Sequence, residues 1–315
     1  MISCETGSRN QKNPDGTGPR GYFPEFITPT EKYFDLSLGI IPDIKEDTYQ
    51  LKISGAVDKP ALFSLEQLTY LEMVEKTLTI ECIGNVANGD LVGTVTWKGF
   101  RVYDLLDSLG IQDGATIIKY HCADGYFTYN TLEELQNSEV LGALYMNEES
   151  IPPMYGYPLR VIFPGYFGVR HPGWVVEIEL LENSIEDYWA QSGWKTDSAM
   201  TIDSKIFFPA DDDKFSVGER IWIGGAAFGS KRISSVEITV DDGKTWIPTT
   251  IRQSLNQDYV WIFWEVWYTP QLPGEITIFS RATSTDSNTQ PRLDKIYYDG
   301  INSWPQVTIS IEDGE

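Results

Sequence analysis

The last third of the chain is a succession of short β-strand patterns with hardly a helix between them, which constrains the fold strongly. Residues 220–223, 233–240, 261–267 and 274–281 have strand patterns. The Asp-Asp-Gly sequence at 241–243 is a hairpin-turn signal. Several short antiparallel strands over about 110 residues are typical of a β-sandwich. We therefore expect residues 199–315 to form an all-β immunoglobulin-like sandwich without a disulfide.

The preceding part of the chain mixes strands with short helices. Residues 48–57, 77–82 and 115–121 read as strands, and residues 100–109 as an amphipathic helix. Ser64 begins another short helix, because Gln67 follows it at the capping-box spacing. The strands and helices show no regular βαβ period, so we expect an α+β domain over residues 22–198.

Residues 1–21 are polar and rich in Gly, Pro and Asn, which predicts a flexible tether. Ile2-Ser3-Cys4 resembles the end of a bacterial lipoprotein cleavage site, and this favours a periplasmic or extracytoplasmic protein anchored by a lipid on Cys4. An ordinary N-terminus with one thiol is the alternative. No apolar run approaches the roughly 20 residues that span a bilayer, so we expect no other contact with a membrane.

The chain is strongly acidic, with 24 Lys and Arg against 46 Asp and Glu and a formal net charge of -22. Such a field repels phosphate backbones, so nucleic acid is excluded as a partner. The acidity fits either solubility alone or recruitment of a basic redox partner, and charge does not decide between them.

Cys82 lies at the end of a predicted strand, on a tight loop with Gly84 and Asn85. A thiolate in such a loop suits a soft or high-valent metal, although a buried structural cysteine is the alternative. Two histidines are too few for a histidine-based zinc site. The dinucleotide-binding, P-loop and GxSxG motifs are absent from the sequence.

Residues 155–170 combine two arginines with several glycines. Arg160 begins an apolar strand pattern, the glycines let the backbone close around a ligand, and Arg170 supplies a second guanidinium for an anionic group. This predicts a site for a phosphate-bearing cofactor, and a strand with a flanking surface arginine is the alternative.

Four blocks in sequence order together resemble the sulfite oxidase family of molybdopterin enzymes. They are residues 79–85 with 97–99, residues 124–126, residues 156–174, and residues 236–246 with 281–282 and 290–291. The resemblance implies that Cys82 ligates molybdenum held by molybdopterin. Tungsten would take the same ligands, so the sequence does not exclude it.

The resemblance also implies a set of cofactor and substrate contacts. The implied cofactor contacts are Phe34, Asp35, Asn85, Cys122, Tyr155, Arg160, Arg170, His171 and Gly173, and Trp194 takes the place of the family's active-site tyrosine. Tyr155 stands where the family has His or Asn, and Gly173 where it has Lys. Val86 and Ala87 stand where sulfite oxidases carry arginines, which removes the clamp for a sulfite dianion.

We therefore expect a molybdenum oxidoreductase that transfers an oxygen atom to or from a small neutral or weakly charged substrate. No haem motif is present, so electrons would pass to a separate partner such as a cytochrome. The alternative is a non-catalytic cofactor-binding or lipid-tethered interaction subunit. The family leaves the oligomeric state open between monomer and homodimer.

Overall fold

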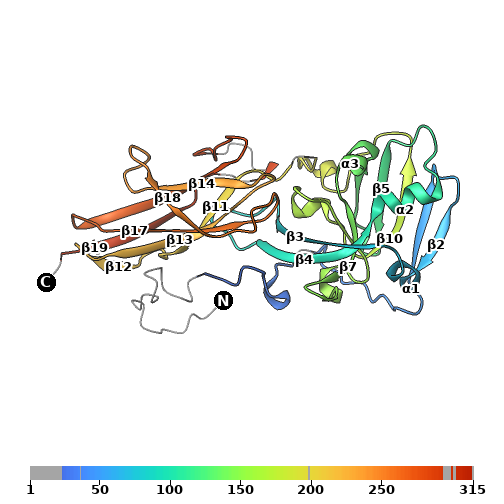
Figure 1. Cartoon of the computed structure of the whole chain (residues 1–315), viewed down its shortest axis with the longest axis horizontal. Helices are drawn as coiled ribbons and strands as arrows, with labels where there is room; N and C mark the ends of the chain where they lie inside the picture. The colour runs from blue at the N-terminus through green and yellow to red at the C-terminus, as the bar shows by residue number, and fades with distance from the viewer. Residues whose placement is uncertain (1–22, 36, 198, 294–298, 301–302, 314–315) are drawn as a thin grey trace.

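The computed structural model describes residues 23–35, 37–197, 199–293, 299–300 and 303–313. The predicted tether and Cys4 lie outside the described residues. The molecule is elongated, with the N-terminal half of the chain forming one lobe and the C-terminal strands forming the other (Figure 1). The structure is mostly β, and its helices are short. No helix in the described ranges is long and apolar enough to span a membrane.

Two sheets build the first lobe. One has the strand order β2-β1-β10-β5-β6 and the other β3-β4-β7-β8, with β9 paired to β7. The strands are β1 (Gln50–Gly55), β2 (Ala61–Ser64), β3 (Met73–Glu81), β4 (Val92–Arg101), β5 (Ile117–Cys122), β6 (Phe127–Thr131), β7 (Leu141–Met146), β8 (Glu149–Ser150), β9 (Arg160–Ile162) and β10 (Val175–Leu181). The strands expected at 48–57, 77–82 and 115–121 correspond to β1, the end of β3, and β5.

In the described part of this lobe, three α-helices and four 3₁₀ helices accompany the sheets. They are α1 (Leu65–Thr69), α2 (Val102–Leu109), α3 (Leu132–Asn137), η1 (Thr30–Lys32), η2 (Pro153–Tyr155), η3 (Gly168–Arg170) and η4 (Ala190–Ser192). The structure confirms the capping box at Ser64, whose hydroxyl accepts the N–H of Gln67 while its own N–H donates to the Gln67 side chain. A second capping box joins Thr131 and Glu134 at the start of α3.

A core formed between β1, β5, β10 and the helices supports the first lobe. Leu51, Leu106, Ile118 and Ile178 in this core are completely buried. Full burial of a side chain of this size contributes about 1.5–3 kcal/mol. The periodic apolar positions of α2 lie here too, as the sequence predicts.

Two sheets also build the second lobe, with the orders β11-β13-β17-β16 and β12-β19-β18-β14-β15. The strands are β11 (Asp203–Phe208), β12 (Lys214–Ser216), β13 (Ile221–Phe228), β14 (Ile233–Thr239), β15 (Ile247–Pro248), β16 (Thr250–Gln253), β17 (Ile262–Tyr268), β18 (Gly274–Ser284) and β19 (Gln306–Glu312). Ile223 and Trp264 of one sheet and Ile238, Ile278 and Ile309 of the other lie in one buried core. Within the described part of this lobe no α-helix occurs, and the expected strand regions are confirmed.

The two lobes meet along β3 and the segment that precedes β17. The Thr79 N–H donates to the Tyr259 carbonyl at 2.8 Å, and the Trp261 N–H donates to the Thr79 hydroxyl at 2.7 Å. The Trp261 indole N–H reaches back to the Phe26 carbonyl at 2.9 Å. β3 therefore carries Cys82, which follows its last residue, to the junction between the lobes.

Candidate active site

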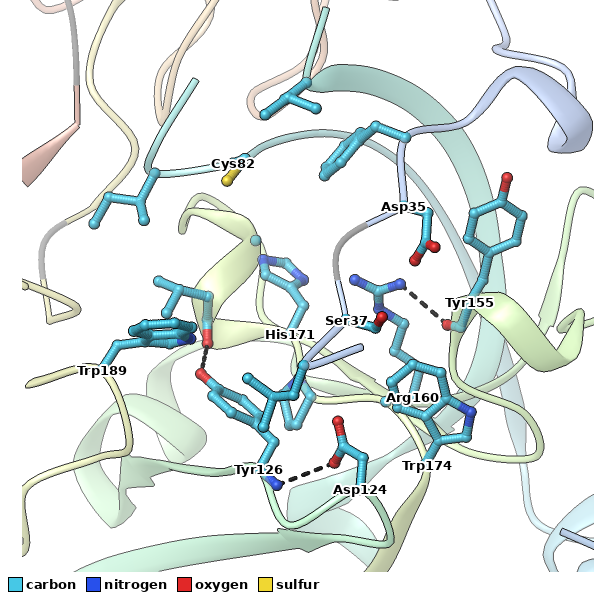
Figure 2. Close-up of a pocket in the computed structure, with 18 of the residues that line it drawn as sticks. Asp35, Ser37, Cys82, Asp124, Tyr126, Tyr155, Arg160, His171, Trp174 and Trp189 are labelled. Carbon is cyan, nitrogen blue, oxygen red and sulfur yellow. Dashed lines mark hydrogen bonds between the residues drawn. The ribbon is translucent and has the colours of Figure 1, made fainter. Parts of the chain in front are cut away.

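A cavity of about 380 Å³ opens in the first lobe beside Cys82 (Figure 2). Its walls come from six segments that are far apart in the sequence. They contribute Phe34, Asp35, Ser37, Leu38, Cys82, Ile83, Gly84, Leu91, Asp124, Tyr126, Met154, Tyr155, Arg160, Gly168, Val169, His171, Pro172, Gly173, Trp174, Trp189 and Trp194. Eight of the eleven predicted site residues line this cavity, and the other three, Asn85, Cys122 and Arg170, do not.

Cys82 begins the turn that leaves β3. Its N–H donates to the Leu91 carbonyl at 2.9 Å, which closes the base of the loop 82–91. The Gly84 N–H points at the Cys82 sulfur at 3.4 Å. Burial raises the pKa of the thiol, and the N–H groups of Gly84 and Asn85 oppose this shift. A free thiol that faces a cavity and receives N–H groups is suited to hold a metal as a thiolate, because the positive charge of a metal would deprotonate it.

Asn85 does not line the cavity, which departs from the expectation that it contacts the cofactor. Its buried amide instead joins the two ends of the loop. The NH₂ group donates to the Glu81 carboxylate at 2.9 Å, and the amide oxygen accepts the Leu91 N–H at 3.1 Å. Asn85 thus fixes the loop that presents Cys82.

Glu81 itself is buried and faces the buried Asp203 of the second lobe. Burial is the main cause that raises the pKa of Glu81 to about 7. Burial and the neighbouring Glu81 carboxyl raise the pKa of Asp203 well above its usual range. Two such acids are stable side by side when they share one proton.

Among the described residues that line the cavity, Arg160 supplies the only Arg or Lys side chain. One guanidinium nitrogen donates to the Tyr155 carbonyl at 3.1 Å, and the group lies 5.5 Å from the centre of the Trp97 ring. Its Nε is buried and has no hydrogen-bond partner in the part of the chain that the structure describes. Burial lowers the pKa of Arg160, and the nearby Asp35 carboxylate opposes that shift. A half-buried cation whose buried Nε is an unused donor favours an anionic ligand, so Arg160 fits a phosphate group of a cofactor.

Gly156 and Gly173 bring two cavity segments into backbone contact. A Cβ atom on Gly173 would lie 2.7 Å from the Gly156 Cα, and the Trp174 N–H donates to the Gly156 carbonyl at 2.9 Å. Gly156 also has a φ of +108°, which favours glycine. Tyr155, beside them, directs its hydroxyl away to the Tyr33 carbonyl at 2.9 Å.

His171 lines the cavity as a neutral ring. Its Nδ1 accepts the Phe163 N–H at 3.4 Å, and its Nε2 faces the Tyr166 carbonyl at 3.1 Å, so Nε2 carries the proton. Burial, with smaller effects from Arg160 and Arg170, lowers the pKa of His171 to about 3. In Figure 2 the ring lies between the Cys82 thiol and the Arg160 guanidinium.

Arg170 and Cys122 lie outside the cavity, unlike the sequence expectation. The Arg170 guanidinium is buried and donates to Glu134 at 3.0 Å and to the Thr196 carbonyl at 3.4 Å. Glu134 therefore pairs with the charge of Arg170 within the fold, at a place that the cavity does not reach. Cys122 is buried at the end of β5, and burial raises the pKa of its thiol well above the usual value.

Several cavity residues were not singled out as site residues from the sequence. They include Asp124 and Tyr126 in the turn after β5, together with Trp174 and Trp189. The Tyr126 N–H donates to the Asp124 carboxylate at 3.0 Å, and burial raises the pKa of Asp124 (Figure 2). The Asp-Gly-Tyr turn directly after a strand was a usable signal for the first two, whereas nothing local distinguishes Trp189.

Two domain families match consecutive parts of the chain. Residues 38–189 match the oxidoreductase molybdopterin binding domain, and residues 195–312 match the Mo-co oxidoreductase dimerisation domain. The first match contains Cys82 and Arg160.

Curated relatives match across most of this chain but extend well beyond it. The chain is 25% identical to the nitrate reductase [NAD(P)H] of Hordeum vulgare, over 91% of this chain and 39% of that protein. It is 26% identical to the mitochondrial sulfite oxidase of Drosophila melanogaster, over 85% of this chain and 56% of that protein. The rat enzyme (Rattus norvegicus) of the same name is 25% identical, over 91% of this chain and 62% of that protein. The chain thus spans less than two thirds of each of these relatives.

The fold also resembles a solved structure, the sulfane dehydrogenase SoxCD from Paracoccus pantotrophus. The two superpose with a TM-score of 0.82 at 20% identity, over 92% of this chain and 84% of the other. At this identity the likeness supports the fold.

Proposed function

The chain belongs to the sulfite oxidase family of molybdopterin oxidoreductases, and on that premise we propose that it transfers an oxygen atom to or from a small uncharged substrate. The observation that carries the proposal is the charge distribution of the cavity. Of the lining residues that the structure describes, Arg160 is the only Arg or Lys, His171 is neutral, and Asp35 and Asp124 supply carboxylates. An anionic substrate would lack the charge-assisted donors that bind oxyanions.

The cavity residues fit the molybdenum-molybdopterin cofactor of the family. Cys82 would hold the metal, and the unused Nε of Arg160 would bind the cofactor's phosphate. Gly156 and Gly173 let the backbone approach a bound group without side-chain interference. When bound, this cofactor supplies two-electron oxygen-atom transfer, and the protein orients it and shapes the substrate site.

The surroundings of Cys82 support an uncharged substrate. Ile83 follows it directly, Leu91 closes the base of its loop, and Trp194 lies against Gly84. These side chains offer apolar contact, and water is a poor competitor for such a surface. A sulfoxide or an N-oxide fits this environment, and its reduction takes up two electrons and two protons and releases one water molecule.

A separate redox protein would exchange the electrons with the site. A basic cytochrome is suited to the net charge of -22, because opposite charges steer association. We further propose a homodimer formed through residues 199–315, which we assign to an immunoglobulin-like domain, and an extracytoplasmic location. Residues 22–198 would form the cofactor-binding domain.

The test begins with metal analysis of purified protein from a host that makes the cofactor. The wild type and Cys82→Ala would be assayed for molybdenum, tungsten and the pterin, and their visible spectra followed during dithionite reduction. Near-stoichiometric metal and a reducible thiolate-to-metal band that Cys82→Ala lacks would support the redox site. Wild-type protein with neither metal nor pterin would refute the enzyme and favour the non-catalytic interaction subunit.

A substrate screen then tests the charge argument. Reduced enzyme would be offered a neutral sulfoxide and a neutral N-oxide, and oxidised enzyme would be offered sulfite. We expect turnover with a neutral oxide at a lower KM than with any anion. Efficient oxidation of sulfite would contradict the proposed substrate class while leaving the cofactor assignment intact.

A further inference from the structure

The loop that carries Cys82 rests on a strand of the other lobe. The largely buried Lys205 side chain of β11 donates to the Gly89 carbonyl at 2.6 Å and pairs with Asp90. The next residue along, Ile206, donates its N–H to the Asn88 side chain at 2.8 Å. β11 therefore holds the second half of the loop 82–91.

The first half of the loop is tied to the same strand. Glu81, directly before Cys82, faces Asp203, the first residue of β11. Asp203 is itself fixed by the Ser204 N–H at 2.7 Å and the Gln290 amide at 2.8 Å. β11 thus contacts both sides of Cys82.

No second-lobe residue appears among those that line the cavity in the described ranges. Any influence of this lobe on the chemistry must then pass through contacts such as those of β11. The exposed fractions of the Lys205 and Asp90 side chains show which of the two Lys205 contacts restrains the loop more strongly. The Lys205 side chain is 13% exposed, whereas the Asp90 side chain is 95% exposed, so the ion pair is screened by water and the carbonyl contact is the stronger restraint.

We propose that Lys205 is a positioning residue for the cysteine ligand, and that the second lobe thereby sets the geometry of the metal site as well as mediating dimerisation. The effect on the metal rests on the proposed function, whereas the contacts that restrain the loop are present without the cofactor. The orientation of a thiolate ligand and the hydrogen bonds around it tune the metal that it binds. Releasing the loop should therefore change both the access to the Cys82 thiol and the properties of a bound metal.

The experiment compares Lys205→Met with Lys214→Met. Methionine keeps a long apolar side chain and removes the ammonium group. Lys214 pairs with Glu312 at 2.9 Å in the same lobe, but its side chain is 69% exposed and lies away from the loop, so it is a matched control. In cofactor-free protein, the rate of iodoacetamide alkylation at Cys82 would be followed by site-resolved mass spectrometry.

We expect Lys205→Met to raise the alkylation rate of Cys82 by about 10- to 100-fold, because loss of a charge-assisted hydrogen bond shifts the opening equilibrium of the loop by that order. Lys214→Met should match the wild type. In the cofactor-loaded protein, only Lys205→Met should shift the thiolate-to-metal band and the reduction potential. Equal alkylation rates in all three proteins would overturn the inference.

A second variant keeps the test open if Lys205→Met does not fold. Asn88→Gly removes the acceptor for the Ile206 N–H, and glycine tolerates the positive φ of 63° found at this position. Asn88→Asp retains an acceptor and should restore the wild-type alkylation rate. Because alkylation is measured without the cofactor, failure of the loop restraint and failure of the enzyme assignment give different results.

Discussion

His171 gives the molecule a predictable dependence of stability on pH. Its ring is buried, both ring nitrogens are used by backbone groups, and its pKa is lowered to about 3 from the usual 6.5. Between these two values the unfolded chain binds a proton that the folded protein does not. The stabilising contribution is therefore complete above pH 6.5 and is lost progressively as the pH falls toward 3.

The magnitude follows from the difference between the two pKa values. Lowering the pH from 8 to 4.5 protonates the unfolded histidine through two pH units while the folded ring stays neutral, which costs about 2.7 kcal/mol of unfolding free energy. The assay is urea unfolding of cofactor-free protein at both pH values, for the wild type and for His171→Gln. Glutamine can donate and accept as the neutral ring does, but it does not titrate in this range.

We expect the wild type to lose about 2.7 kcal/mol more than His171→Gln between these pH values, whatever the other titrating groups contribute to both. Proton NMR gives an independent measurement of the protonation of His171, because the chain has only two histidines whose ring signals must be told apart. The His171 ring resonances, assigned by their absence from His171→Gln, should not shift between pH 8 and 4.5. Parallel losses of stability in the two proteins, or titration of His171 near pH 6.5, would refute the burial argument.

Three further changes test separate parts of the structure. Arg160→Met should lower cofactor retention at least tenfold, measured as pterin per chain. It should not lower the Tm of cofactor-free protein, because it removes a half-buried charge whose buried Nε is an unused donor; a clear fall in that Tm would contradict the assignment. Gly225→Ala should destabilise the second lobe by about 1–3 kcal/mol in urea unfolding, because the added Cβ would overlap the Lys205 carbonyl of the neighbouring strand. An unchanged urea midpoint of unfolding would contradict the pairing of β11 with β13. Ser64→Ala should cost about 1 kcal/mol through loss of the α1 cap, with Ser64→Thr as the retained-cap control, and metal content should stay at the wild-type level.

The elements found from the sequence are those whose signal is local. The cap at Ser64 and the apolar face of α2 depend on residues within a few positions of one another. β4 and β11 were not predicted from the sequence. β4 lies between β3 and β7, and β11 pairs with β13 across the intervening β12. A strand order of this kind cannot be obtained from periodicity alone.

The two arginines of residues 155–170 show that local sequence also fails to predict long-range contacts at the site. Both followed apolar or glycine-rich sequence, and both were expected to bind an anion. The structure separates them because Glu134, which lies 36 positions before Arg170, neutralises that side chain, whereas among the described residues no carboxylate forms an ion pair with Arg160. The distinction depends on a long-range contact that the local sequence does not contain.

The small number of cationic side chains in the cavity also limits how the site can select a substrate. If Arg160 binds the phosphate of the cofactor, no other Arg or Lys among the described lining residues remains for the substrate. Recognition near Cys82 then depends on the shapes of Ile83, Leu91 and Trp194. An apolar surface discriminates by only about 1–3 kcal/mol for each methylene group gained or lost. We therefore expect kcat/KM to vary by no more than roughly 10- to 200-fold across neutral oxides that differ by one such group. A far steeper preference would require a polar contact to the substrate, for which Asp124 is a candidate in the cavity.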